Sequence, residues 1–265
     1  MRFRPFLVVT ALIAALSVFG SSIAVSAPTP KKNKKKKKNE QTDPLLSQAL
    51  MRQGFVFMQQ QRFEDAIEQF RQADAATPGN ATVYNMIGLC YLSLERYDKA
   101  LEYFDLALAK IPGFTDARNN RGTTYLALKQ YRLAEVDFVA ALSDSTYPHR
   151  WKVYYNLGVT YLSRGQVGAA EENFRKAIAA PVPVFEAYLR LAEIAQAQGH
   201  TDSALSLLEE ARLKYPDRIE GTLAYGRLLI DLDRPQEARP YLEDVIESDP
   251  SSAYAAQARS LLGST

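Results

Sequence analysis

The sequence is poor in the residues that build most catalytic and metal centres. Its 265 residues include one cysteine, Cys90, and two histidines, His149 and His200. A single cysteine excludes an intramolecular disulfide, and no histidine and cysteine cluster has the spacing of a metal site. The G-x-S-x-G motif and phosphate-binding glycine loops are also absent. We therefore expect no enzyme, no cofactor, no metal and no small-molecule substrate, and we interpret Cys90 as a small core residue.

Charge is unevenly distributed along the chain. The net charge is +2, but residues 1–43 hold nine Lys or Arg against two Asp or Glu, a net charge of +7. Residues 44–265 therefore carry a net charge of −5. Because nucleic-acid binding depends on neutralising phosphates with Lys and Arg, we expect no nucleic acid as a partner of this acidic part.

The first 27 residues have the layout of a secretory signal peptide. Arg2 and Arg4 precede an apolar run that begins at Phe6, and small residues follow up to Ala27. No cysteine is present here, which excludes a lipoprotein signal, because lipid attachment needs a cysteine thiol. We take residues 1–27 as a signal peptide or signal anchor and expect an exported protein that is periplasmic or membrane-associated.

The same apolar run allows an alternative topology. Residues 6–25 are long enough to span a bilayer, and seven lysines follow between Lys31 and Lys38. The positive-inside rule would then give an inner-membrane anchor with the remaining chain facing the cytoplasm. Residues 28–43 are lysine-rich and low in complexity, which predicts a disordered linker. This linker is either solvated or attracted to an anionic membrane surface, and both interpretations stay open.

Beyond residue 43 the sequence repeats itself, with intervals of 34 residues and one of 36. A small residue recurs as Gly54, Gly88, Gly122, Gly158, Ala192 and Gly226, and a second as Ala66, Ala100, Ala134, Ala170, Ala204 and Ala238. A bulky residue lies four positions after each member of the second series: Phe70, Phe104, Phe138, Phe174, Leu208 and Leu242. Six copies in register make a chance pattern remote.

Each repeat is expected to form a hairpin of two α-helices. Apolar residues three and four apart mark one face in each half of a repeat, and Pro112 ends a second helix because proline lacks a backbone N–H. Helices approach closely where side chains are small, so we expect Gly88 to face Ala100, with Phe104 filling the volume around them. Gly165 is expected to loosen the turn of its hairpin. One hairpin cannot bury its apolar side alone, so neighbouring hairpins must stack into a superhelix.

The stretch from Tyr84 to Pro112 carries the most specific pattern. It reads Tyr84-x2-Ile87-Gly88-x2-Tyr91, then Ala100-x3-Phe104-x2-Ala107, then Pro112. This spacing resembles the signature of the tetratricopeptide-repeat family. The resemblance implies an all-α fold: a right-handed superhelical solenoid of six tetratricopeptide helical hairpins with a C-terminal capping helix.

We predict one folded domain over residues 44–265. Its repeats are expected at about 47–80, 81–114, 115–150, 151–184, 185–218 and 219–252, followed by a cap at 253–263. The cap places Tyr254, Ala258, Leu261 and Leu262 on one side, where they can cover the apolar end of the sixth repeat.

A second resemblance narrows the family. The runs Asn119-Asn120-x-Gly122 and Tyr155-Asn156-x-Gly158, with two extra residues between Ala141 and Pro148, look like the junction of the third and fourth repeats in type IV pilus biogenesis proteins. These are the six-repeat pilotins called PilF, PilW or Tgl. The resemblance implies an exported protein that helps the outer-membrane secretin to assemble. This chain departs from that family because it lacks the lipid-bearing cysteine.

In stacked hairpins the first helices line a concave face, which is where we expect a partner to bind. By register, we predict that its partner-binding groove includes Met51, Phe55, Asn85, Leu89, Asn119, Asn120, Thr123, Lys152, Tyr155 and Val159. Apolar groups beside amides suit an extended peptide or a helix of a protein partner. The carboxylate-clamp pattern of some tetratricopeptide proteins is matched only at Asn120 and Lys152, which disfavours a chaperone-tail clamp.

The sequence therefore predicts a non-enzymatic scaffold for protein–protein interaction in the cell envelope. The second resemblance adds a role in type IV pilus or secretin assembly. The alternative is a membrane-anchored cytoplasmic adaptor with the same groove, which binds a peptide or helix of a partner protein. We also predict that changes at Asn85, Asn119 or Tyr155 weaken partner binding without unfolding the chain.

Overall fold

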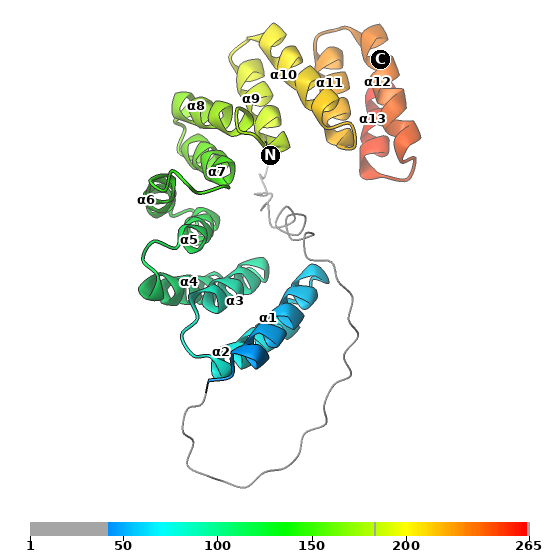
Figure 1. Ribbon diagram of the computed structural model, residues 1–265. Helices are drawn as coiled ribbons and strands as arrows, with labels where there is room; N and C mark the ends of the chain where they lie inside the picture. Colours follow the sequence, from blue (N-terminus) through cyan, green and yellow to red (C-terminus); the bar gives the residue numbers. More distant parts are fainter. Residues whose placement is uncertain (1–41, 183, 264–265) are drawn as a thin grey trace. The chain divides into compact units, whose positions relative to one another are not determined.

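The computed structural model describes residues 42–182 and 184–263, which form thirteen α-helices and contain no strand (Figure 1). The predicted all-α class is confirmed for these residues. The helices are α1 Pro44–Gln59, α2 Phe63–Ala76, α3 Ala81–Ser93, α4 Tyr97–Lys110, α5 Thr115–Ala127, α6 Tyr131–Leu142, α7 Arg150–Ser163, α8 Val167–Ile178, α9 Phe185–Ala197, α10 Thr201–Lys214, α11 Ile219–Asp231, α12 Pro235–Ser248 and α13 Ala253–Gly263. The predicted signal segment and the lysine tract lie outside the described residues.

The chain divides into two compact units, and the boundary lies between Leu133 and Ala134, inside α6. In the first unit α1 packs on α2 and α3 on α4, while α2 also contacts α3 and α4 contacts α5. In the second unit α7 packs on α8, α9 on α10 and α11 on α12, with further contacts between successive pairs. Each unit is therefore built of helical hairpins that stack on their neighbours in sequence. A single continuous domain over residues 44–265 stays a prediction.

Local side chains fix where the first helices begin. The Asp43 carboxylate accepts a hydrogen bond from the Leu46 backbone N–H (3.0 Å), and Pro44 opens α1. Asn80 caps α3 in the same way, because its side-chain oxygen accepts from the Thr82 N–H at 2.9 Å. Capping satisfies amide groups that the first turn of a helix leaves without partners, and proline costs nothing at that position.

The turn inside each hairpin contains one residue with a left-handed backbone. These residues are Gln61, Glu95, Lys129, Gly165, Gly199 and Asp233, with φ between +56° and +78°. Glycine reaches this conformation without steric cost, whereas the four other residues adopt it under mild strain. Glycine at Gly165 fits a conformation that all six turns share, and the expectation that it loosens its turn stays a prediction.

The small residue of the first helix receives a ring from the second helix. A Cβ added at Gly88 would lie 2.6 Å from the Phe104 ring, and Gly54 stands in the same relation to Phe70. Real Cβ atoms do not approach so closely, so the glycine is what lets the ring enter. The sequence predicted that Gly88 faces Ala100, but its nearest side-chain atoms belong to Phe104, and both Ala100 and Phe104 are fully buried.

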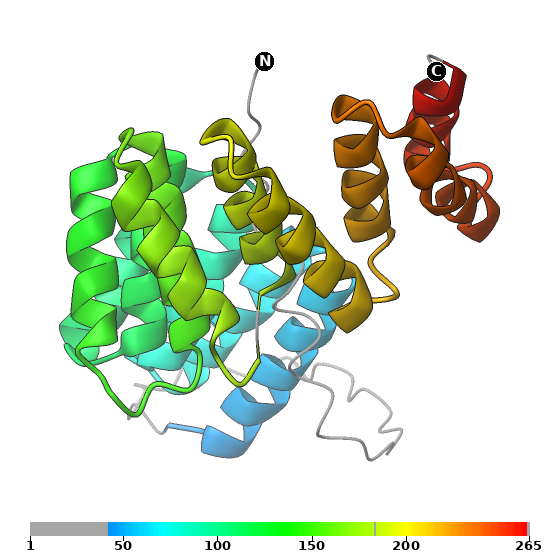
Figure 2. The same ribbon diagram turned by 90° about the horizontal axis from the view of Figure 1, so that it is seen from above.

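The C-terminal helix α13 lies against α12 and also contacts α11 (Figure 2). Ala258 is fully buried there, and Tyr254, Leu261 and Leu262 pack on the cluster that contains Leu242. The side chains that the sequence placed on one face of this helix therefore cover the apolar side of the last hairpin. Among the described helices, none combines the length and the apolar character needed to cross a membrane.

Candidate functional site

The predicted groove residues come from the first helices of four successive hairpins. The ten residues are Met51 and Phe55 on α1, Asn85 and Leu89 on α3, Asn119, Asn120 and Thr123 on α5, and Lys152, Tyr155 and Val159 on α7. On three of these helices a glycine lies against a phenylalanine ring of the second helix: Gly54, Gly88 and Gly158. We describe each unit by itself.

The structure divides these ten residues by accessibility. Met51, Phe55, Thr123, Lys152 and Val159 are half-buried, whereas Asn85, Leu89, Asn119, Asn120 and Tyr155 are buried. The groove prediction therefore needs correction for the second group, because a partner cannot reach buried side chains. The physical reason is that the following hairpin covers part of each first helix, so some inner positions become contacts between repeats.

Two of the buried amides bind each other. The Asn120 Nδ2 donates to the Asn85 Oδ1 at 2.9 Å, which joins α5 to α3, and Asn85 is only 1% exposed. A buried amide that loses its partner costs about 1–3 kcal/mol. The expectation that a change at Asn85 would weaken partner binding without lowering stability therefore no longer holds, because that change would leave the Asn120 amide without its acceptor.

Tyr155 has a similar role between hairpins of the second unit. Its ring packs against Phe174 with centroids 5.7 Å apart, and its hydroxyl accepts a hydrogen bond from Arg190. Arg190 in turn pairs with Glu193 at 2.8 Å. Burial raises the pKa of Tyr155, so the phenol stays neutral. This side chain connects α7 to α9 and is not open to a partner.

Two of the three accessible apolar residues of the predicted groove, Met51 and Phe55, lie in the first unit. Met51, Phe55 and Met58 on α1 and Met86 on α3 are half-buried and pack against the same core cluster, and we call these four residues the methionine strip. Phe55 is held by an edge contact with Phe70 at 5.6 Å. Three of the four methionines of the chain belong to this strip. Methionine is flexible and polarisable, so such a strip adapts to differently shaped apolar groups.

The groove prediction omitted Met86 because it assigned Asn85, and not the residue that follows it, to the accessible side of α3. Met86 follows Asn85 directly and occupies the position that Asn120 has in the next repeat. The structure buries Asn85 and leaves Met86 half-exposed. The clustering of methionines in the first two repeats was a usable signal for this strip.

The first helices of the last repeats are linked by polar contacts. Arg218 pairs with Glu186 of α9 at 3.0 Å and with Glu220 of α11 at 3.4 Å. The Tyr254 hydroxyl of α13 donates to the Glu220 carboxylate at 3.2 Å. These contacts join α9, α11 and α13 in a chain. Glu186 and Glu220 are therefore engaged in contacts within the unit.

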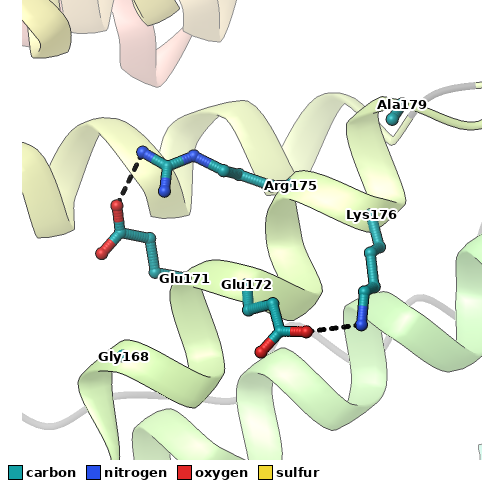
Figure 3. Close-up of a pocket in the computed structure, with 6 residues that line it drawn as sticks. All are labelled: Gly168, Glu171, Glu172, Arg175, Lys176 and Ala179. Atoms are coloured by element: carbon teal, nitrogen blue, oxygen red, sulfur yellow. Dashed lines mark hydrogen bonds and ion pairs between the residues drawn. The ribbon is translucent and has the colours of Figure 1, made fainter.

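Two shallow depressions are present on the described surface. One, of about 380 Å³, lies along α8 and is lined by Gly168, Glu171, Glu172, Arg175, Lys176 and Ala179 (Figure 3). The charged groups there pair along the helix, Glu171 with Arg175 at 2.7 Å and Glu172 with Lys176 at 2.6 Å. The Lys176 ammonium holds the pKa of Glu172 below its ordinary value. These side chains do not converge on a common point, so the depression has the character of a solvated helix surface.

The second depression, of about 260 Å³, lies between α2 and the α3–α4 hairpin. Arg71 donates to the Tyr91 hydroxyl at 2.8 Å, Arg96 pairs with Glu64 at 3.1 Å, and Lys99 lies over the Tyr91 ring. Its cations are therefore engaged with neighbouring side chains.

Reactive groups are few in the described part of the chain. Cys90 is buried, and burial raises the pKa of its thiol to about 12, which suppresses the nucleophilic thiolate. Within residues 42–182 and 184–263 no three His, Cys, Asp or Glu residues are grouped so that they could hold a metal ion.

The repeats define a class of protein built for binding other polypeptides. Family models of the tetratricopeptide repeat match residues 47–113, 119–183 and 195–262. The chain therefore belongs to the tetratricopeptide-repeat family, whose stacked hairpins form scaffolds for protein interaction.

The chain is also similar to several solved structures. It is similar to PilF of Pseudomonas aeruginosa, with 20% sequence identity, a TM-score of 0.68, and coverage of 82% of this chain and 97% of PilF. It is also similar to PilW, described as a widely conserved type IV pilus biogenesis factor, with 23% identity, a TM-score of 0.70, and coverage of 80% and 97%. The predicted resemblance to the PilF and PilW proteins is confirmed.

A third solved structure with the same fold is YrrB, a tetratricopeptide-repeat protein with an unusual peptide-binding site. It shares 21% identity at a TM-score of 0.52, with coverage of 73% of this chain and 99% of YrrB. At these identities the likeness of all three structures shows the fold alone. A comparison with proteins of curated function finds no match.

Proposed function

We propose that this protein is a non-enzymatic scaffold of the cell envelope that assists the assembly of a type IV pilus secretin. The coarser part, a scaffold for protein interaction, follows from membership of the tetratricopeptide-repeat family. The finer part is supported by the likeness to PilF and to PilW, which is described as a pilus biogenesis factor. The signal-like layout of residues 1–27 supports export to the envelope.

The methionine strip is the observation that carries the assignment of a binding surface. Its side chains are apolar and half-buried, and Phe55 is fixed from below by the Phe70 ring. A partner segment with apolar side chains would complete the burial of these groups, and each fully buried side chain of this size contributes about 1.5–3 kcal/mol. A helix or extended segment with apolar anchors fits this surface.

Charge on the strip is expected to abolish partner capture. We expect a Met51→Glu and Met58→Glu double variant to form at least about tenfold less secretin multimer in the outer membrane, because each carboxylate would need to be desolvated on binding. The measurement is the amount of heat-resistant secretin multimer in membranes of cells that carry the variant. The control is Met51→Leu with Met58→Leu, which keeps an apolar strip of similar volume.

Folding of both double variants is checked by circular dichroism. Normal secretin multimers with the two glutamates in a folded protein would overturn the assignment of the strip. Loss of multimers with the two leucines as well would mean that the variants act through something other than the polarity of the surface.

Export is a separate part of the proposal and has its own test. An alkaline phosphatase fused after Thr265 is expected to be active, because this enzyme works only outside the cytoplasm and the repeats would then lie there. The cytoplasmic alternative rests on the seven lysines that follow the apolar run. An inactive phosphatase, together with an active cytoplasmic reporter at the same position, would favour that alternative.

A further inference from the structure

The second helix of the third repeat, α6, has an unusual exposed face. Leu133, Val136 and Val139 are 48%, 64% and 53% exposed. They are spaced three residues apart, so they lie on one side of the helix, and we call them the outer stripe. Large apolar side chains that gather at the surface are a common mark of a contact with another molecule.

The corresponding positions are polar or small in most other repeats. They are Asp65, Glu68 and Arg71 in α2; Lys99, Glu102 and Asp105 in α4; Ala169, Glu172 and Arg175 in α8; Ser203, Ser206 and Glu209 in α10; and Glu237, Pro240 and Glu243 in α12. The hairpin fold therefore does not require apolar residues at these positions. The outer stripe is a property of the third repeat and needs its own explanation.

The charges beside the outer stripe are positive. Lys129 and Arg132 are exposed at the start of α6, and neither makes an ion pair among the described residues. The nearest carboxylates on this helix are engaged: Glu135 pairs with Arg164 and accepts from the Tyr161 hydroxyl at 3.0 Å, and Asp137 is buried. A partner would therefore meet apolar side chains next to two available cations.

We propose that the outer stripe binds an amphipathic helix of another protein, whose apolar side covers Leu133, Val136 and Val139 and whose acidic end meets Lys129 and Arg132. α6 has 12 residues, so its length of about 18 Å matches three turns of a partner helix. Apolar side chains at positions i, i+3 and i+6 are the pattern that a second helix packs against. This surface lies on a second helix and is distinct from the methionine strip on the first helices.

A second copy of the chain fits the outer stripe less well. A stable protein interface buries about 800 Å² on each partner, which is more than three side chains provide. An acidic helix does not need so large an interface, because a single helix covers only a small surface. Its carboxylates can also pair with Lys129 and Arg132.

The test uses the purified chain and two fluorescent helical peptides. One peptide has leucines at heptad spacing and glutamates beside them, and the other has lysines in place of the glutamates. We expect the acidic peptide to bind more tightly, as measured by fluorescence anisotropy. Val136→Glu is expected to weaken its binding about tenfold or more, because a charge would enter the apolar contact. Arg132→Glu is expected to reduce the preference for the acidic peptide.

The matched control is Leu213→Glu, which places the same charge on another exposed leucine, in α10. It is expected to leave binding unchanged. Circular dichroism of all three variants reports whether they fold. Absence of binding by the acidic peptide, or equal binding by wild type and Val136→Glu, would overturn the proposal.

Two further measurements identify a different occupant of the outer stripe. Sedimentation velocity would show a second copy, if the wild type self-associates and Val136→Glu does not. Flotation with phosphatidylglycerol vesicles would show a lipid surface, if the wild type binds and Val136→Glu does not. Either result without peptide binding contradicts the partner helix.

Discussion

Replacing Phe104 by alanine is expected to lower the free energy of unfolding by about 3–5 kcal/mol. Its ring is fully buried and enters the space that Gly88 leaves open on the facing helix. Alanine would remove the ring and leave a cavity between α3 and α4, and the helices cannot close it without shifting their neighbours. Urea unfolding followed by circular dichroism measures the change.

The control for this variant lies two residues further along the same helix. Leu106 is 40% exposed, so Leu106→Ala is expected to cost less than about 1 kcal/mol. Both variants remove apolar atoms from α4, and neither weakens the helix itself, because alanine has the highest helix propensity. Similar losses at the two positions would show that the ring and glycine contact does not hold the hairpin together.

Adding one methyl group at Gly88 is expected to destabilise the chain by about 1–3 kcal/mol. The new Cβ would lie 2.6 Å from the Phe104 ring, a distance that forces the ring or the helix to move. The fifth repeat shows how the contact tolerates a methyl group, because it has Ala192 where the others have glycine and Leu208 where the first four have phenylalanine. We therefore expect the cost of Gly88→Ala to fall markedly when Phe104→Leu is also present.

Four proteins test this coupling: the wild type, Gly88→Ala, Phe104→Leu and the double variant. Their urea unfolding curves give the interaction energy between the two positions, and neighbouring residues of this kind couple by about 0.5–3 kcal/mol. A helix interior favours alanine over glycine by about 1 kcal/mol. In the Phe104→Leu background, which lacks the ring, this preference opposes any remaining steric cost of Gly88→Ala. Equal costs of Gly88→Ala with and without the ring would contradict the steric explanation.

Most of the hairpin fold could be read from the period of the sequence. Small residues such as Gly88 and Ala100 recur at one interval because each hairpin has the same close contacts. This period is visible in the sequence even when the residues that they contact are not known. The left-handed turns could not be read so easily. Gln61, Glu95 and Lys129 give no sign of their positive φ, and only the glycines at two equivalent positions point to it.

The candidate site was predicted less well, for a physical reason. Register shows which residues lie on the inner side of a first helix, but it does not show how far the next hairpin covers them. Asn85 and Asn120 are 35 positions apart, one repeat and one residue, and they hydrogen-bond across the junction. Paired amides at that offset would have been the signal for a structural contact. The clustering of methionines on the same helices was visible in the sequence, but their half-exposed position is known only from the structure.

An array of hairpins has a face at each end that could accept one more hairpin. Helix α13 fills that place after α11 and α12, where Ala258 is fully buried against the last pair. Helix α13 therefore occupies the surface of the α11–α12 hairpin on which a further hairpin would stack, so the stack cannot continue there.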